Sequence, residues 1–161
     1  FLAAPPPESG LSERGFDLAF IDGDHSFSSV LADFCALEAY AAPGAVIVLH
    51  DTLPLTAEIA TPVRQTVFYT GDGWKILPCL RALRPELRLL TLPAAPSGLT
   101  LVVGLDPSSR RLQERQDVIL EAYRHLPPTA AIEDPARLLA LGSNDPAALA
   151  QWLSARPIGP S

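Results

Sequence analysis

The sequence predicts an α/β fold in which two apolar strands lie side by side, with a helix between them along the chain. Residues 16–21 and 45–49 are almost continuously apolar, and a helical pattern separates them. Polar residues follow both strands: Asp22, Gly23, Asp24 and His25 after the first, and His50 and Asp51 after the second. Parallel neighbouring strands present their carboxyl ends at one edge of a sheet, where open α/β folds bind ligands. We therefore expect one site that contains two histidines and three aspartates.

The composition indicates a folded domain and disfavours several classes of protein. Hydrophobic residues make up 48 % of the 161 residues, which is enough apolar material for one packed core. The net charge of −6 and the single lysine, Lys75, argue against a nucleic-acid partner, because phosphates attract clusters of basic side chains. Apolar runs fall short of the roughly 18 residues that span a bilayer. We therefore expect no membrane partner.

The two cysteines predict the redox state and the compartment of the protein. Cys35 and Cys79 are far apart and lack the spacing of a metal site. Isolated cysteines of this kind are usually buried thiols. We therefore expect reduced, buried cysteines in a cytoplasmic protein.

The first strand is expected to need neighbours on both sides. Residues 2–14 are rich in Pro, Ser and Gly and predict a loop, so they offer residues 16–21 no partner strand. A continuous apolar run is typical of a strand that is covered on both faces. Because the chain begins at Phe1 and has no methionine, we expect a missing N-terminal half. Without it, the open strand edge would favour self-pairing in a homodimer.

The segment between the two apolar strands predicts a helix and a turn. Ser26 is a typical N-cap, and apolar residues then recur at helical spacing, at Phe27, Val30, Leu31, Phe34 and Leu37. This pattern predicts an amphipathic helix that ends near Tyr40. Pro43-Gly44 predicts a turn before the second strand at residues 45–49.

The segment after the second strand is expected to form loops that border the site. Pro54 and Pro62 break any long helix, so we expect loops around one short helix, near residues 57–60 or after Pro62. Loops at this edge of a sheet usually build substrate pockets. Because residues 52–69 carry few charges, a mostly apolar or neutral hydroxylated small molecule is the expected ligand.

A helix and a hairpin are expected next. Residues 74–83 have a helical pattern in which Trp74 is expected to be a core residue. Residues 87–92 and 98–105 predict two strands, joined by a Pro-Ala-Ala-Pro-Ser-Gly turn. The simplest arrangement of this pair is an antiparallel hairpin at the sheet edge.

The end of the chain is expected to form a small helical appendage. Residues 110–124 predict a helix, and two Asp-Pro pairs, at 134–135 and 145–146, place proline at the first position of further helices. Residues 1–107 would then form the α/β domain, and residues 108–161 the appendage.

Two motifs resemble those of class I S-adenosylmethionine-dependent methyltransferases. The run FDLAFIDGDHS begins at Phe16, and the run APGAVIVLHDT ends at Thr52. Together they are similar to the branch of the family with IDGDH-type and PGG-HD-type motifs, although Ala45 replaces the second glycine. Residues 71–105 are similar to the closing strands of the same branch. The resemblance implies a Rossmann-like methyltransferase sheet, of which this chain is the C-terminal half with strands four to seven.

The resemblance also implies an activity, the transfer of a methyl group from S-adenosylmethionine to a small hydroxylated acceptor. Members of the family bind this cofactor through a glycine-rich turn after the first strand and an acidic residue that ends the second strand. This chain has neither, and Gly71 and Gly73 do not form such a turn. The residues that would border the methionine side of the cofactor are Asp22, Gly23, Asp24 and His25. The intact parent is expected to methylate, and this fragment alone is expected to be inactive.

Similar catechol-type O-methyltransferases suggest roles for individual residues. In those enzymes a divalent cation is held by the aspartate that ends the fourth strand and by a residue pair that ends the fifth, which correspond here to Asp22 and to His50 and Asp51. The base lies three residues after the first aspartate, at His25, and Asp51 is the second expected catalytic residue. An all-oxygen site would favour Mg²⁺, whereas His50 as a ligand would favour Mn²⁺, Fe²⁺ or Zn²⁺.

Other interpretations stay open at this point. Asp-Gly is common in turns, and Asp24 and His25 precede a helix, where a purely structural role is ordinary. The chain could be a noncatalytic, truncated methyltransferase-like module that binds a partner through its open edge. A metal-dependent phosphoesterase would also use an Asp-x-His motif, but the Gly-Asp-x-x-Asp-Arg-Gly and Gly-Asn-His-Glu turns are missing. Some relatives with these motifs are hydroxylases.

Overall fold

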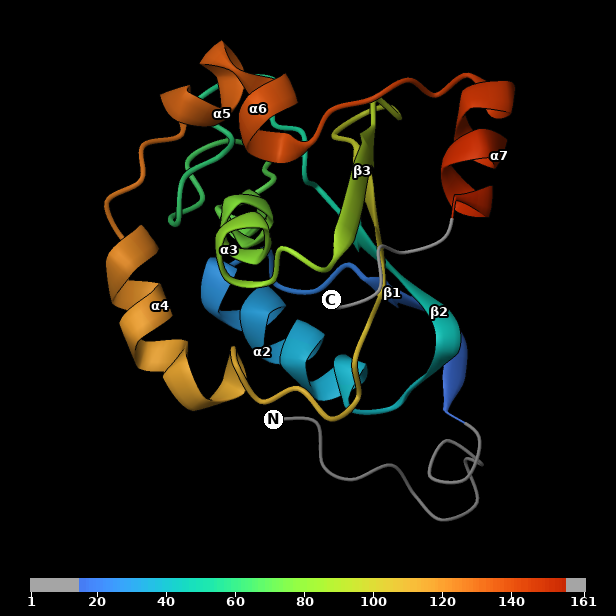
Figure 1. Cartoon of the computed structure of the whole chain (residues 1–161). Coiled ribbons are helices and arrows are strands. Elements are labelled where there is room, and N and C mark those ends of the chain that lie inside the picture. Colours follow the sequence, from blue (N-terminus) through green and yellow to red (C-terminus); the bar gives the residue numbers. More distant parts are fainter. Residues whose placement is uncertain (1–14, 156–161) are drawn as a thin grey trace.

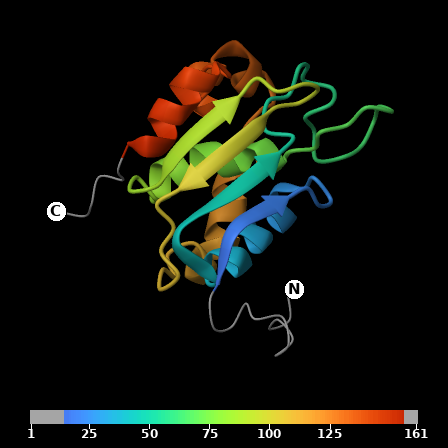
Figure 2. The ribbon, with the colours of Figure 1, turned by 90° about the vertical axis from the view of Figure 1, so that its right-hand side faces the viewer.

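The computed structural model describes residues 15–155 and contains a four-stranded mixed sheet. The strands lie in the order β1-β2-β4-β3, with β1 parallel to β2, and β4 antiparallel to β2 and β3 (Figure 1, Figure 2). The predicted antiparallel hairpin at the sheet edge is confirmed. The architecture is consistent with part of a Rossmann-like sheet. In chain order, the elements are β1 (Phe16–Ile21), α2 (Phe27–Glu38), β2 (Ala41–His50), η2 (Gly73–Lys75), α3 (Ile76–Leu83), β3 (Arg88–Leu92), β4 (Leu99–Val103), η3 (Gln113–Arg115), α4 (Gln116–Tyr123), α5 (Thr129–Glu133), α6 (Pro135–Leu139) and α7 (Pro146–Ser154).

Helices cover the two faces of the sheet unequally. Figure 1 shows α2, α3 and α4 on one side of the sheet, and α7 on the other side near β3. The core lies on the side of the first three helices, and its fully shielded side chains include Leu31, Phe34, Ile47, Trp74 and Leu77. Leu112, Ile119, Ala131 and Leu139, which all follow residue 107, belong to the same core. Among the described helices, none is both long enough and apolar enough to cross a bilayer.

The outer face of β1 differs from the expectation that both faces of this strand are covered. Ala19 and Ile21 pack into the core, whereas Leu18 and Phe20 point the other way and are 67 % and 57 % exposed. That expectation is therefore wrong for the described part of the chain. Side chains alternate along a strand, and α7, which lies on this side of the sheet, is near β3 at the opposite edge (Figure 1). Within residues 15–155, β1 pairs with β2 alone.

The predicted helix and turn between β1 and β2 have different outcomes. The Ser26 hydroxyl accepts a hydrogen bond from the Ser29 backbone N–H at 3.2 Å, so the predicted N-cap of α2 is confirmed. The predicted turn at Pro43-Gly44 is instead part of β2, which starts at Ala41. The pairing skips several residues of β2 there, and Gly44 has a φ of +84°. Glycine permits this conformation, so the chain bulges without leaving the sheet.

Two predicted helices are absent or shorter. Residues 51–72 form turns and bends without a helix, so the predicted short helix is wrong. Side chains bind nearby carbonyl groups there instead; Arg64, for example, donates to Val67 O at 2.6 Å. The helix predicted from residue 110 starts only at η3, because the guanidinium of Arg110 donates to the carbonyl groups of Pro107 and Ser109 in a preceding turn.

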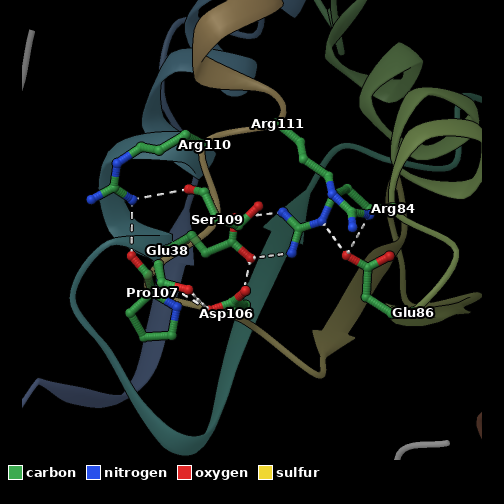
Figure 3. A network of polar contacts seen from close by, with 9 residues as sticks. Glu38, Arg84, Glu86, Asp106, Pro107, Ser109, Arg110 and Arg111 are labelled. Carbon is green, nitrogen blue, oxygen red and sulfur yellow. Dashed lines mark hydrogen bonds and ion pairs between the residues drawn. The ribbon is translucent and has the colours of Figure 1, made fainter. Parts of the chain in front are cut away.

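A buried ion pair connects α2 with the end of α3 (Figure 3). Arg84 is fully shielded from solvent and donates to both carboxylate oxygens of Glu38, at 2.7 and 2.8 Å. It also donates to Glu86 at 2.6 Å, and the backbone N–H of Asp106 donates to Glu38 at 3.1 Å. Burial acts to lower the pKa of Arg84, but the hydrogen bonds and charges of Glu38 and Glu86 outweigh it and raise that pKa. Arg84 therefore stays charged inside the protein.

Both cysteines are free thiols, as predicted. Cys79 is buried, as expected, whereas Cys35 is only half-buried, so the prediction that both are buried is wrong for Cys35. Burial raises the pKa of Cys35 to about 11 and that of Cys79 to about 12. Neither side chain is therefore a reactive thiolate at neutral pH.

Candidate functional site

The polar ends of β1 and β2 lie together at one edge of the sheet. The parallel register pairs Ile21 with Leu49, so the residues that follow these two are also neighbours. His50 Nδ1 lies 3.1 Å from Asp22 Oδ1 and 3.4 Å from Asp51 Oδ1. The structure thus brings together the two strand ends that the sequence singled out.

A short contact joins the two predicted catalytic residues, His25 and Asp51. His25 Nδ1 lies 2.6 Å from Asp51 Oδ2, and the Asp51 side chain is buried. Both residues have a left-handed backbone, with φ of +66° for His25 and +56° for Asp51. This conformation is uncommon for residues other than glycine and persists where the surrounding structure enforces it, often at functional sites. The pair is therefore the strongest candidate for a functional role.

The segment Gly71-Asp72-Gly73 holds the backbone of His25. The N–H of Gly73 donates to the carbonyl of His25 at 2.9 Å. Gly71 approaches the same carbonyl so closely that a Cβ atom at this position would lie 2.2 Å from its oxygen. Asp72 accepts a hydrogen bond from the N–H of Phe27 at 2.9 Å and pairs with the buried Lys75 at 3.1 Å. These contacts fix the start of α2 and the residue before its N-cap.

A second segment, the turn between β3 and β4, holds Asp51. The hydroxyl of the buried Ser97 donates to Asp51 Oδ1. The carbonyl of Ser97 accepts a hydrogen bond from the N–H of Leu53 at 2.7 Å. Gly98, with a φ of +81°, packs so closely on Leu53 that a Cβ atom would lie 2.4 Å from the Cβ of Leu53. These contacts attach the turn to Leu53, just after Asp51 in the chain.

Gly23 and Asp24 lie in the same loop and have different surroundings. Asp24 accepts hydrogen bonds from the Ser26 N–H at 2.9 Å and from the Ser29 hydroxyl at 2.8 Å. These bonds, the one from the backbone of Ser26 foremost, lower the pKa of Asp24. Gly23 is exposed. Asp24 therefore supports the turn that leads into the Ser26 N-cap of α2, and its carboxylate is engaged away from the His25–Asp51 contact.

Three of these residues could hold a metal ion. Asp22, His25 and Asp51 each offer one ligand atom, and these atoms lie within 4.8 Å of one another. His50 is outside this group, and its Nδ1 contacts Asp22. Two carboxylates and one imidazole suit Mn²⁺, Fe²⁺ or Zn²⁺ better than Mg²⁺, which prefers oxygen ligands. The donor set therefore fits a divalent transition metal.

Aromatic and apolar side chains surround the polar group. The ring of Tyr69 meets the ring of His25 edge-on, with 6.1 Å between the centroids, and the ring of Phe20 lies 6.1 Å from that of His50. In Figure 2 the loop that follows β2 extends beyond the ends of β1 and β2. Four of its apolar side chains are exposed, namely Leu55, Val63, Val67 and Phe68. This loop therefore exposes apolar surface beyond the strand ends.

Ser97 and the Gly71-Asp72-Gly73 segment are parts of the site that the sequence does not predict. Ser97 belongs to a run that predicts only a turn, and the two glycines do not have the pattern of a cofactor loop. The closely spaced glycines were the available signal, because glycine permits both a positive φ and close contact of two backbones. Which residue they would contact depends on the tertiary structure.

Replacing Gly71 by alanine is expected to destabilise the fold by more than the roughly 1–3 kcal/mol of a strained backbone, because the new Cβ would also collide with the His25 carbonyl. Gly44→Ala is a matched control, since Gly44 also has a positive φ but has nothing within 4 Å of its Cβ position. Urea unfolding of both variants measures the difference. Equal losses of stability would show that the contact with His25 is unimportant.

Part of the chain matches a known protein family. Residues 4–52 match the model of a protein family described as a methyltransferase domain. The match covers less than half of the chain, and its described part contains β1, α2, β2 and the pair of His25 and Asp51. No curated protein matches the chain.

Proposed function

We propose that this chain contributes the acceptor side of the active site of an S-adenosylmethionine-dependent methyltransferase, which methylates a hydroxyl group of a small molecule. The observation that carries the proposal is the 2.6 Å contact between His25 and Asp51, both left-handed, at the end of two parallel strands. The methyltransferase match to residues 4–52 supports the reaction class.

The proposed role of His25 is that of a general base. S-adenosylmethionine, when bound, supplies an electrophilic methyl group. Among residues 15–155, no glycine-rich turn joins a strand to a helix, so we assign these residues mainly to the acceptor, while the loop at residues 22–25 would border the methionine side of the cofactor. His25 Nδ1 contacts Asp51, which leaves Nε2 to accept the proton of the acceptor hydroxyl. Asp51 orients the ring and stabilises the positive charge that the proton brings.

Methyl-transfer assays test this role. The protein is expressed from the complete reading frame that encodes the chain, and labelled S-adenosylmethionine is offered with a panel of phenols and sugars. The expected result is that His25→Gln lowers the rate on the order of 10²–10⁴-fold, the usual contribution of a general base. His125→Gln, the same substitution at an exposed histidine outside the site, serves as the control and should keep most of the activity. Equal rates for wild type and His25→Gln would contradict the proposal.

A second candidate role is divalent-metal assistance of the same reaction. The supporting observation is the group of Asp22, His25 and Asp51, whose ligand atoms lie within 4.8 Å. A bound cation would attract the acceptor oxygen and ease the loss of its proton. Asp22 and Asp51 would supply carboxylate ligands, and His25 would then act as a ligand instead of a base.

Binding of Mn²⁺ to the chain distinguishes the two roles. Electron paramagnetic resonance titration is expected to detect a bound ion in wild type and a loss of affinity of more than about tenfold in Asp51→Asn and in Asp22→Asn. Asp24→Asn is the matched control and should bind as wild type does, because its carboxylate is engaged with Ser26 and Ser29. Unchanged affinity in Asp51→Asn would rule out this metal site and leave His25 as the base.

A further inference from the structure

We infer that Ser97 is a positioning residue that sets the orientation of the Asp51 carboxylate, and through it the tautomer of His25. The inference rests on the proposed role of the His25–Asp51 pair. Ser97 lies 46 residues after Asp51 in the chain and is buried, and its hydroxyl donates to Asp51 Oδ1. The other carboxylate oxygen, Oδ2, is the one in contact with His25.

The two contacts engage different oxygens of the Asp51 carboxylate, and His50 Nδ1 also lies 3.4 Å from Oδ1. A carboxylate can rotate about its bond to Cβ, and a partial rotation would carry its two equivalent oxygens out of reach of the imidazole. A hydroxyl bound to Oδ1 removes this freedom, because a rotation that breaks the Ser97 hydrogen bond would leave buried polar atoms unpaired. The contact between Oδ2 and His25 Nδ1 is therefore favoured, with the proton on Nδ1 and the lone pair on Nε2.

The position of Ser97 is itself held by the backbone. Its carbonyl accepts a hydrogen bond from Leu53 N–H at 2.7 Å, and the next residue, Gly98, packs directly on Leu53. Leu53 lies two residues after Asp51. The hairpin turn is therefore hydrogen-bonded to the same segment of the chain whose Asp51 carboxylate accepts the Ser97 hydroxyl. These backbone contacts hold the Ser97 hydroxyl in place beside Asp51, as is typical of groups that orient the partner of a histidine.

Nitrogen-15 NMR of the histidine rings tests the inference, at a single mildly alkaline pH and without added metal. Wild type is expected to show His25 mainly with the proton on Nδ1. In Ser97→Ala this fraction should fall at least about twofold, because the carboxylate is free to rotate. Ser108→Ala is the matched control, since the Ser108 hydroxyl also donates to an aspartate, Asp106 at 2.7 Å, but on the surface. The control should leave the His25 signal unchanged.

Ser97→Thr and Ser97→Val form a second pair that keeps the test valid if Ser97→Ala does not fold. These two side chains have nearly the same shape, and only threonine has a hydroxyl. Threonine should keep the tautomer of wild type, and valine should not. If folded Ser97→Ala or Ser97→Val keeps the wild-type tautomer, Ser97 has no positioning role. The His25–Asp51 pair then keeps its geometry without Ser97, and the proposed base is unaffected. If wild type already has the His25 proton on Nε2, the pair is not formed, and the proposed base fails together with the role of Ser97.

Discussion

Replacing Arg84 by methionine is expected to lower the free energy of unfolding by about 3–5 kcal/mol, the usual cost of removing one partner of a buried ion pair. Arg84 is fully shielded from solvent, and it is the partner of both oxygens of Glu38 (Figure 3). Methionine has a similar length, so most of the loss would come from the unpaired carboxylate of Glu38. Urea unfolding followed by circular dichroism measures the change.

Arg111→Met is the matched control for this variant. Arg111 also lies beside Glu86, at 3.6 Å, but its side chain is 67 % exposed. Water screens exposed ion pairs, so the control should change the stability by less than about 1 kcal/mol. Replacing Glu38 by leucine together with Arg84→Met should recover part of the loss, because no buried charge is then left unpaired. Similar losses in the Arg84 and Arg111 variants would contradict the assigned importance of the buried pair.

Replacing Trp74 by alanine is expected to cost about 3–5 kcal/mol, as is typical when a large aromatic side chain is removed from a core. The prediction that Trp74 is a core residue is confirmed, because its side chain is fully buried and its Nε1 donates to the carbonyl of Ala60 at 3.2 Å. Trp74 lies in η2, the short turn of helix before α3, and follows the segment that holds His25. Its loss should therefore loosen both the core and the site.

Trp152→Phe is the control for this second variant. Trp152 is half-buried, and the guanidinium of Arg88 lies 4.5 Å from its ring centroid, a contact worth about 0.5–1 kcal/mol. The chain has two tryptophans, so fluorescence of each variant reports the other one. Unfolding curves should separate the two variants clearly. If Trp74→Ala were no less stable than Trp152→Phe, the core around Trp74 would not hold the fold as described.

Local patterns explain the parts of the fold that the sequence predicted well. The N-cap at Ser26 and the apolar spacing after it predict α2, and the turn-rich run before Gly98 predicts the hairpin of β3 and β4. These features depend on residues close together in the chain. The wrong predictions concerned features that depend on distant contacts. The structure has a bulge that keeps Pro43 within β2 instead of a turn, an exposed outer face of β1 instead of a covered one, and no helix in the loop after Pro54.

Local sequence patterns are enough to place Asp22, His50 and Asp51 at the ends of β1 and β2, and thus at one edge of the sheet. The arrangement of these side chains depends on the tertiary structure. The left-handed backbone of His25 is held by the Gly71-Asp72-Gly73 segment, and the carboxylate of Asp51 by Ser97. The physical reason is that strand periodicity is a local property, whereas a strained backbone and an oriented carboxylate require contacts between segments that are distant in the chain.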